Sequence, residues 1–151
     1  METGLNKISD IPLIIPDSKY LPLLPSSGLN YINLSFFNAW LVGFTIAEGS
    51  FFTKNNLDSC FQLKQRIHKE LFIAFNLLFD SSKKITIDQN KYAQLSLSSK
   101  KDIQAVINFF SSPNNPSLLG NKLIQYNNWI NDLKLSKRYG KLNFPEQIIK
   151  E

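Results

Sequence analysis

Two stretches of alternating polarity constrain the fold of this 151-residue chain more than any other feature. The first covers residues 60–67, where Phe61 and Leu63 alternate with polar residues, and the second covers residues 84–98. Because successive side chains of a β-strand point to opposite faces, both stretches predict strands with one apolar and one polar face. With the strand expected before them, the polar face carries Lys54, Gln62, Lys64, Arg66, Lys84, Thr86, Tyr92, Gln94 and Ser96.

Apolar residues at helical spacing separate these strands and follow them. Ser35 and Ser99 are predicted helix N-caps, and Ser99 opens a capping-box pattern with Asp102. The expected elements are a helix over 36–47, strands over 50–54 and 60–67, a helix over 69–79, strands over 84–88 and 92–98, and helices over 99–110 and 122–136. This order predicts an α+β fold, in which a four-stranded antiparallel sheet carries its helices on one face.

The ends of the chain differ from this middle part. Four of the seven prolines lie in residues 1–34, where they block regular helix and favour an extended path. We therefore expect an extended arm or linker over residues 1–34, one domain over 35–145 and a short tail over 146–151.

The polar face of the predicted sheet has two interpretations. It is compatible with plain solvation, and it is also what contacts to base edges in a major groove require.

The helix expected over residues 36–47 repeats small side chains every four residues, at Ala39, Gly43 and Ala47. Such a stripe lets the backbone of another helix approach closely. Since the flanking residues are large and apolar, we expect this helix to be buried on nearly all sides. The alternative interpretation is an ordinary core helix that needs a small residue where it crosses a neighbour.

Glu48 stands at the C-terminal end of that helix. A carboxylate there meets the negative end of the helix dipole, at a cost of roughly 0.3–1 kcal/mol at an exposed site. A divalent cation such as Mg²⁺, which takes oxygen ligands, would offset this cost. If two copies of the helix packed through their small residues, two Glu48 side chains would meet at the axis and could hold metal ions for phosphodiester hydrolysis.

The nine residues 41–49 (Leu-Val-Gly-Phe-Thr-Ile-Ala-Glu-Gly) resemble the LAGLIDADG motif, whose eighth position is a metal-binding Asp or Glu. The similarity extends over about residues 30–145 and includes the segment 118–122 (Leu-Leu-Gly-Asn-Lys). It looks like the second half of two-motif mitochondrial intron endonucleases and maturases. Ile46 departs from the pattern, in which this position is often acidic, but the position is not the metal ligand.

The resemblance implies three catalytic residues. Glu48 would bind the catalytic Mg²⁺, Gln65 would position water or metal, and Lys122 would stabilise developing charge beside the scissile phosphate. The alternative interpretations are that Gln65 is a surface residue of a strand and that Lys122 is a lysine in the first turn of a helix.

Two functions stay open at this point. The first is a Mg-dependent, site-specific DNA endonuclease, which needs a second motif and therefore a homodimer or a longer two-motif protein. The second is a non-cleaving RNA-binding protein, such as an intron-splicing maturase or a component of a ribonucleoprotein or mitoribosome. The formal charge of +5 suits double-stranded DNA and structured RNA alike, and Lys137 and Arg138 are expected to contact phosphates.

The composition of the chain argues against several other classes of protein. A single cysteine excludes an internal disulfide framework, and one cysteine with one histidine argues against a structural zinc site. No apolar stretch approaches the roughly 20 residues that span a bilayer, so no membrane partner is expected. The first residues lack secretory or transit features, and abundant Asn, Lys, Ile and Leu fit an A/T-rich coding sequence. We therefore expect a mitochondrial protein encoded in the organelle.

Overall fold

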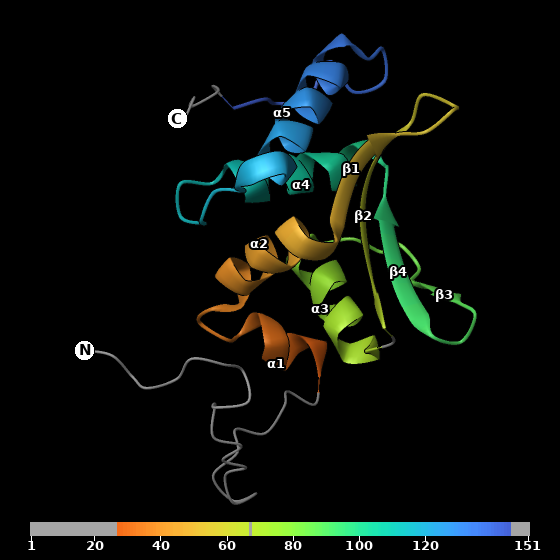
Figure 1. Ribbon diagram of the computed structural model, residues 1–151, viewed down its shortest axis with the longest axis vertical. Helices are drawn as coiled ribbons and strands as arrows, with labels where there is room; N and C mark the ends of the chain where they lie inside the picture. The colour runs from red at the N-terminus through yellow and green to blue at the C-terminus, as the bar shows by residue number, and fades with distance from the viewer. Residues whose placement is uncertain (1–26, 67, 146–151) are drawn as a thin grey trace, which may run out of the picture.

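The computed structural model describes residues 27–66 and 68–145 as an α+β domain (Figure 1). Its elements are α1 (Gly28–Ile32), α2 (Phe37–Glu48), β1 (Gly49–Thr53), β2 (Ser59–Arg66), α3 (Lys69–Leu78), β3 (Thr86–Asp88), β4 (Tyr92–Leu97), α4 (Lys100–Ser111) and α5 (Gly120–Leu135). Within the described part of the chain, no helix has the length and apolar character needed to cross a bilayer.

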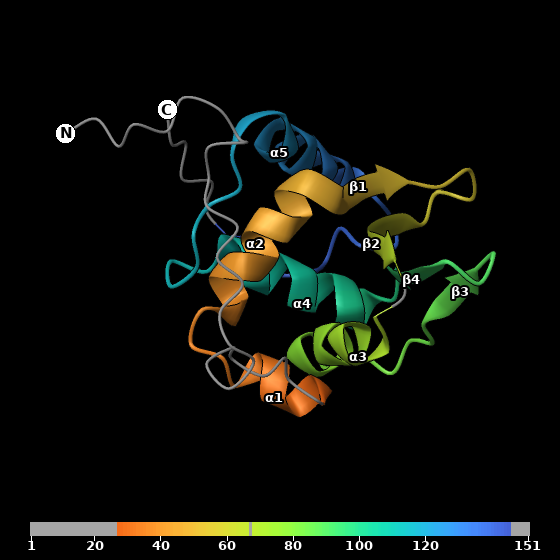
Figure 2. The same ribbon diagram turned by 60° about the horizontal axis from the view of Figure 1, so that its bottom comes forward.

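The four strands form one antiparallel sheet in the order β1-β2-β4-β3. The helices gather on one side of it, as the two views show (Figures 1 and 2). In β4 the burial alternates residue by residue, with Ala93, Leu95 and Leu97 buried and the residues between them half-buried. The predicted fold class, including the single helix-covered face, is therefore confirmed.

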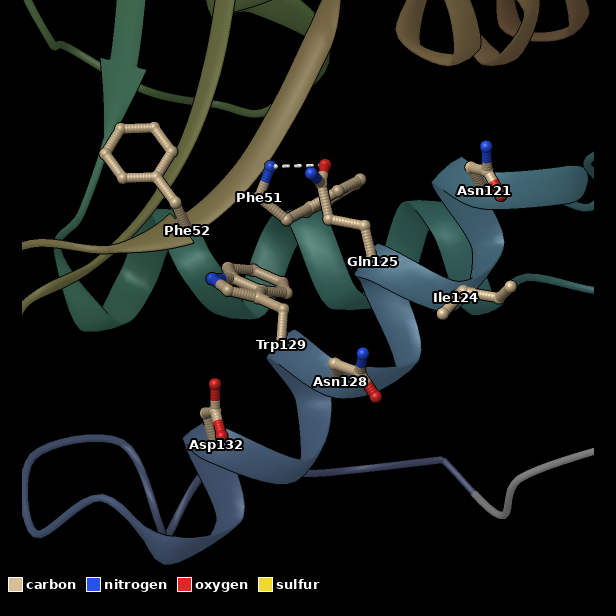
Figure 3. A pocket seen from close by; sticks show the side chains of 8 residues that line it. All are labelled: Phe51, Phe52, Asn121, Ile124, Gln125, Asn128, Trp129 and Asp132. Carbon is tan, nitrogen blue, oxygen red and sulfur yellow. Dashed lines mark hydrogen bonds between the residues drawn. The ribbon is translucent and has the colours of Figure 1, made fainter.

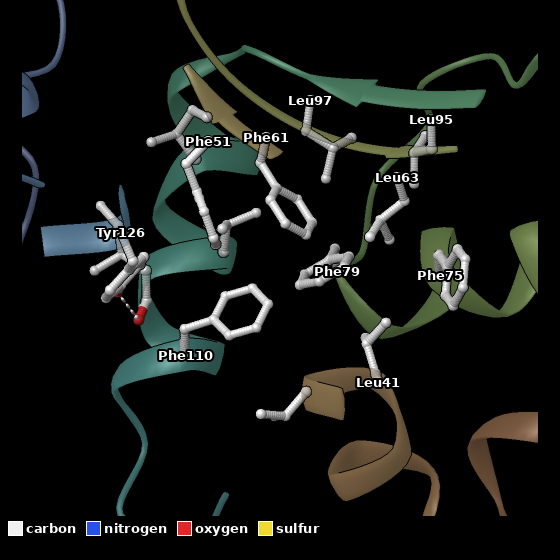
Figure 4. Packing of buried hydrophobic residues seen from close by; sticks show 14 of the residues in the cluster. Leu41, Phe51, Phe61, Leu63, Phe75, Phe79, Leu95, Leu97, Phe110 and Tyr126 are labelled. Atoms are coloured by element: carbon white, nitrogen blue, oxygen red, sulfur yellow. Dashed lines mark hydrogen bonds between the residues drawn. The ribbon is translucent and has the colours of Figure 1, made fainter. Parts of the chain in front are cut away.

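Aromatic rings dominate the core between the sheet and the helices. The ring of Phe51 in β1 lies 5.0 Å from that of Phe61, 5.5 Å from that of Phe110 and 5.0 Å from that of Trp129, measured between centroids. Figure 4 shows side chains of α2, α3, α4 and α5 converging on these strand residues. Burying one such side chain stabilises the fold by about 1.5–3 kcal/mol. Packing around this cluster therefore holds α2, α3, α4 and α5 against the sheet.

Helix α1 lies inside residues 1–34, where an extended arm was expected, so that part of the expectation was wrong. The Ser27 hydroxyl caps this helix by accepting from the Asn30 N–H at 3.2 Å. The Gly28 N–H donates to the Glu70 carboxylate at 3.0 Å, and the buried Tyr31 hydroxyl lies 2.8 Å from Nε2 of His68. Folded structure therefore begins before residue 34. The rest of the expected arm, residues 1–26, and the expected tail, 146–151, lie outside the described residues.

The starts of two elements also differ from the predicted ones. The N-cap position of α2 is Phe36, with no side-chain cap, so the prediction for Ser35 was wrong, whereas Ser99 caps α4 as predicted by accepting from the Asp102 N–H at 3.1 Å. Strand β3 starts only at Thr86, which leaves Lys84 in the preceding loop. As an edge strand, β3 pairs with a neighbour on one side only, and its ladder with β4 covers three residue pairs.

Candidate active-site end and nucleic-acid interface

Glu48 ends α2 at the point where the chain turns directly into β1. Gly49 is both the C-cap of the helix and the first residue of the strand, and its N–H donates to the Thr45 carbonyl. A Cβ at position 49 would lie 2.6 Å from the Thr45 Cγ2, closer than real Cβ contacts, so the turn requires glycine. The tight turn leaves the Glu48 side chain exposed at the edge of the helical layer.

Lys122 reaches this same turn from α5. Its ammonium group donates to the Gly49 carbonyl at 2.5 Å and to Oε1 of Gln125 at 3.3 Å. Gly120 begins α5 with a φ of +60°, a left-handed conformation that favours glycine. The structure therefore brings Lys122 beside the residue that follows Glu48, although 73 positions separate Lys122 from Gly49.

Gln125 holds α5 against β1 and was not singled out from the sequence. Its Oε1 accepts from the Phe51 N–H at 3.1 Å, which satisfies a donor on the outer edge of the sheet (Figure 3). An open pocket of ≈ 360 Å³ lies beside this contact and is lined mainly by α5 residues, among them Asn121 and Asn128. Gln125 follows Lys122 by three residues, so a shared helix face was the only signal that sequence offered.

Gln65 lies at the same end of the sheet by register. Strand β1 begins with Gly49 opposite Leu63, so Gln65, two residues later in β2, extends beyond β1 on the face that Leu63 shares. It is half-buried, and its Oε1 accepts from the Arg66 N–H at 2.8 Å. No hydrogen bond joins it to Glu48 or Lys122 in the described part of the chain.

The small-residue stripe of α2 is open within this chain. Ala39, Gly43 and Ala47 are all exposed, and a Cβ built at Gly43 would meet nothing within 4 Å. The buried residues of α2 lie on its other side, and Trp40, beside the stripe, is 39% exposed. The prediction of burial on nearly all sides was wrong for a single chain, because the sheet and α3 cover only one side of the helix.

The polar sheet face carries the predicted side chains in cross-strand rows. Lys64 stands opposite Gln94, which in turn stands opposite Thr86, and the next row pairs Gln62 with Ser96. The Gln94 amide donates to the Ser96 hydroxyl at 3.1 Å, which donates to Oε1 of Gln62 at 3.3 Å. This row of amides and hydroxyls is held in place by its own hydrogen bonds.

The cations of this face differ in their pairing. The Lys64 ammonium lies 3.0 Å from the Asp88 carboxylate and 5.4 Å from the centroid of the Tyr92 ring. Lys54 and Arg66 are exposed, and neither forms an ion pair with any described residue. Among the described residues, the unpaired cations of this face therefore lie at the ends of β1 and β2, outside the row of amides and hydroxyls.

Lys137 and Arg138 follow α5 and lie near the turn between β1 and β2. The Arg138 guanidinium pairs with the Asp58 carboxylate, and this hydrogen bond raises the pKa of the arginine. Tyr139 is buried, and its hydroxyl donates to the Ser98 carbonyl at 2.6 Å, which fixes the segment to the sheet. Lys137 stays exposed, so of the two residues only Lys137 keeps an unpaired charge within the described chain.

A metal ion at Glu48 would need further ligands from outside the described residues. In residues 27–66 and 68–145, no three His, Cys, Asp or Glu side chains group together as a ready metal site. Glu48 supplies one exposed carboxylate, free of hydrogen bonds to the described residues, which suits a hard cation. The donor set therefore fits Mg²⁺ as one half of a site and not as a complete one.

Comparison with known proteins bears on this arrangement. A family model described as LAGLIDADG endonuclease matches residues 41–132, which include Glu48, Gln65 and Lys122. The crystal structure of the homing endonuclease I-GzeII in complex with its DNA target is 27% identical, with a TM-score of 0.52 over 68% of this chain and 39% of that one. This chain thus spans about two fifths of the length of I-GzeII.

Two further crystal structures share the fold. The I-LtrWI homing endonuclease, bound to target DNA, is 18% identical, with a TM-score of 0.54 over 70% of this chain and 41% of that one. The homing endonuclease I-TnaI is 17% identical, with a TM-score of 0.52 over 66% of this chain and 78% of that one. The matched unit is therefore a minor part of two of these chains and the larger part of the third.

Proposed function

This chain belongs to the LAGLIDADG endonuclease family, and from that premise we propose that it is a Mg-dependent, site-specific DNA endonuclease. The observation that carries the proposal is the open stripe of α2. It ends at Glu48, which has no hydrogen bond or ion pair with the described residues, and Lys122 binds the carbonyl of the next residue, Gly49. DNA accompanies two of the similar structures, those of I-GzeII and I-LtrWI. A mitochondrial location rests on the composition of the chain alone and is part of the proposal.

Cleavage of both strands requires a second unit. The open stripe formed by Ala39, Gly43 and Ala47 offers close helix packing to a second copy or to a further unit of a longer protein. Either arrangement would place a second carboxylate near Glu48. The matched unit covers 39% of the I-GzeII chain, which suits a further unit in a longer protein, and 78% of the I-TnaI chain, which suits a second copy.

Glu48 of each unit would hold Mg²⁺ together with phosphate oxygens of the substrate. When bound, the ion would polarise the phosphate and lower the pKa of a water molecule. Lys122 would stabilise the negative charge that develops on the phosphate, because its bond to the Gly49 carbonyl keeps the ammonium group beside Glu48. Gln65 would orient a water molecule through its carboxamide from the end of β2.

The polar sheet face would contact the DNA. Its ordered row of Gln62, Gln94 and Ser96 presents donors and acceptors suited to base edges in a major groove. Lys54, Arg66 and Lys137 would contact phosphates around this row, since no ion pair with described residues neutralises them.

The alternative function is RNA binding without cleavage, as in an intron-splicing maturase or a ribonucleoprotein component. One observation favours it, namely that no three His, Cys, Asp or Glu side chains among the described residues group together as a ready metal site. The same amides, hydroxyls and cations would serve structured RNA through contacts to its backbone and its unpaired bases.

Cleavage of a plasmid library with a randomised target site, followed by sequencing of the cut ends, tests the proposal. We expect Mg²⁺-dependent cutting at one sequence, and we expect Glu48→Gln to reduce it at least about 100-fold, by analogy with the loss of one charge-stabilising group. Binding to the same DNA should persist, because Glu48 is an exposed carboxylate outside the polar face.

Asp132→Asn provides the matched control, since Asp132 is another exposed helical carboxylate, placed further along α5. It should cut like the wild type. A chain that binds RNA more tightly than duplex DNA and never cuts, with or without Mg²⁺, would support the alternative function and overturn the nuclease proposal.

A further inference from the structure

A group of lysines gathers where the loop after α3 meets the start of α4. The loop is pinned, because the Asn76 amide donates to the Lys83 carbonyl at 2.9 Å and the Ser81 hydroxyl donates to the Asp102 carboxylate at 3.0 Å. The Lys83 N–H donates in turn to the Ser81 hydroxyl at 3.1 Å. An open depression of ≈ 440 Å³ lies between the loop and the helix, lined by Ser82, Lys83, Lys84, Ser99, Lys101 and Asp102.

Positive charge exceeds negative charge at this junction. Lys83, Lys84, Lys100 and Lys101, here called the lysine cluster, are all exposed. Two carboxylates accompany them. Asp102 is buried and already bonded to Ser81, and Asp80 makes an ion pair of 3.4 Å with Lys101 in which both side chains are mostly exposed to water. The lysine cluster is therefore largely uncompensated within the described chain.

The first turn of α4 adds to this imbalance. Lys100 and Lys101 occupy its first two positions, where the helix dipole is positive and cations are unfavourable. The Ser99 hydroxyl accepts from the Asp102 N–H in this turn, whereas a lysine ammonium has no acceptor for a backbone N–H, so the two lysines do not stabilise the start of the helix. A phosphate group would relieve both the mutual repulsion of the lysines and their conflict with the helix dipole.

The lysine cluster adjoins the polar sheet face. Lys84 precedes Thr86 by two residues, and Thr86 pairs with Gln94 on that face. Cys60 lies in the row beyond Gln62 and Ser96; its burial raises the pKa of the thiol, while the charges of Lys54 and Lys83 act in the opposite direction. The strand register places the lysine cluster and Lys54 at the same end of the sheet. Ser99 lines the depression and follows β4, whose Leu97 pairs with Phe61, and Lys54 follows Thr53, which pairs with Ser59.

We propose that the lysine cluster is a second phosphate-binding surface, which holds the backbone of duplex DNA just outside the polar sheet face. The inference rests on the proposed function, because it assumes that DNA lies on that face. It adds Lys83, Lys100 and Lys101 to the interface, none of which belongs to the sheet. These contacts would fix the position of the duplex and would carry no sequence information.

Binding of duplex DNA over a range of salt concentrations tests the inference. Each phosphate contact adds about 0.9 to the slope of log K against log salt. Lys83→Gln/Lys84→Gln and Lys100→Gln/Lys101→Gln should each reduce the slope by up to about 1.8. At a fixed salt concentration near 0.15 M, each pair should weaken binding on the order of tenfold, equally for target and random sequences.

Lys69→Gln/Lys134→Gln is the control, with the same change of charge at two exposed lysines in α3 and α5. Its slope should stay close to that of the wild type, and no variant should have a thermal midpoint well below that of the wild type. Equal slopes for the cluster and control variants, while the wild type binds DNA, would overturn this inference alone. A wild-type chain that does not bind duplex DNA would overturn the proposed function as well.

Discussion

The two sides of α2 are similarly apolar in sequence, yet only one of them is packed within the described chain. Leu41, on the packed side, is fully buried against the sheet and its neighbouring helices, whereas Gly43, on the other side, is exposed. The sheet differs from α2, because its two faces differ in polarity and the apolar face is the covered one (Figure 1). For α2, by contrast, hydrophobic character alone does not show which side the chain buries for itself.

This contrast indicates that the two sides of α2 have different roles. The packed side of α2 contributes to the stability of the domain, and the open side, with Glu48 at its end, is available to a partner. Changes on the packed side should therefore lower the free energy of unfolding. Changes on the open side should alter association or binding and leave stability nearly unchanged.

The largest expected effect is that of Leu41→Ala on the packed side. Removing this buried side chain leaves a cavity beneath the sheet and should lower the free energy of unfolding by about 2–5 kcal/mol. Urea denaturation followed by circular dichroism measures the change. Leu135→Ala is the matched control, since Leu135 is 87% exposed, and it should shift stability by less than about 0.5 kcal/mol. Equal losses for the two variants would refute the contrast.

The second effect is alkaline destabilisation of the packed side. Burial raises the pKa of Tyr126 from 10.0 to about 12, although its hydrogen bond with Ser111 opposes the shift. The folded state then retains the proton longer than the unfolded state, so this stability is complete below pH 10 and is lost as the pH rises to about 12. At 1.36 kcal/mol per unit, the loss is roughly 2–3 kcal/mol.

Thermal unfolding between pH 8 and 11 tests this prediction. Tyr126→Phe cannot ionise, so its stability should fall less steeply above pH 10 than that of the wild type, even though it loses the bond to Ser111. Tyr92→Phe on the open polar face is the control and should keep the wild-type slope. Parallel curves for the wild type and Tyr126→Phe would show that Tyr126 is not protected in the folded state.

Local patterns in the sequence were sufficient to predict most of the fold. The alternation in β4 follows from the two-residue period of a strand, and the cap at Ser99 from its own first turn. The place of Glu48 at a helix end followed from Gly49, which the tight turn requires. Each of these features depends on residues only a few positions apart.

Features that depend on distant partners could not be predicted. Helix α1 is held by Gly28 and Tyr31 through contacts with residues 42 and 37 positions away. The pairing of Arg138 with Asp58 spans 80 positions, whereas the basic surroundings of Arg138 in the sequence predict only a contact with phosphates. Similarly, the stripe of small residues marks one side of α2 in the sequence but does not show that this side stays uncovered within the described chain.

The smallest expected effect on stability is that of Gly43→Gln on the open side of α2. Because a Cβ at this position meets nothing within 4 Å, the substitution should not lower the free energy of unfolding. It should raise it by about 0.5–1 kcal/mol, since glycine is a poor helix former. In a packed pair of helices, however, the added side chain would prevent close approach, so association should be lost.

Sedimentation over a range of concentrations separates the two outcomes, with Asn131→Gln on the exposed side of α5 as the control. If two chains pack through α2, the wild type and the control form dimers and Gly43→Gln stays monomeric. A dimer that survives Gly43→Gln places the contact elsewhere on the surface. A destabilised Gly43→Gln monomer would mean that the chain itself covers this side of α2, which would remove the basis for a second unit at Glu48.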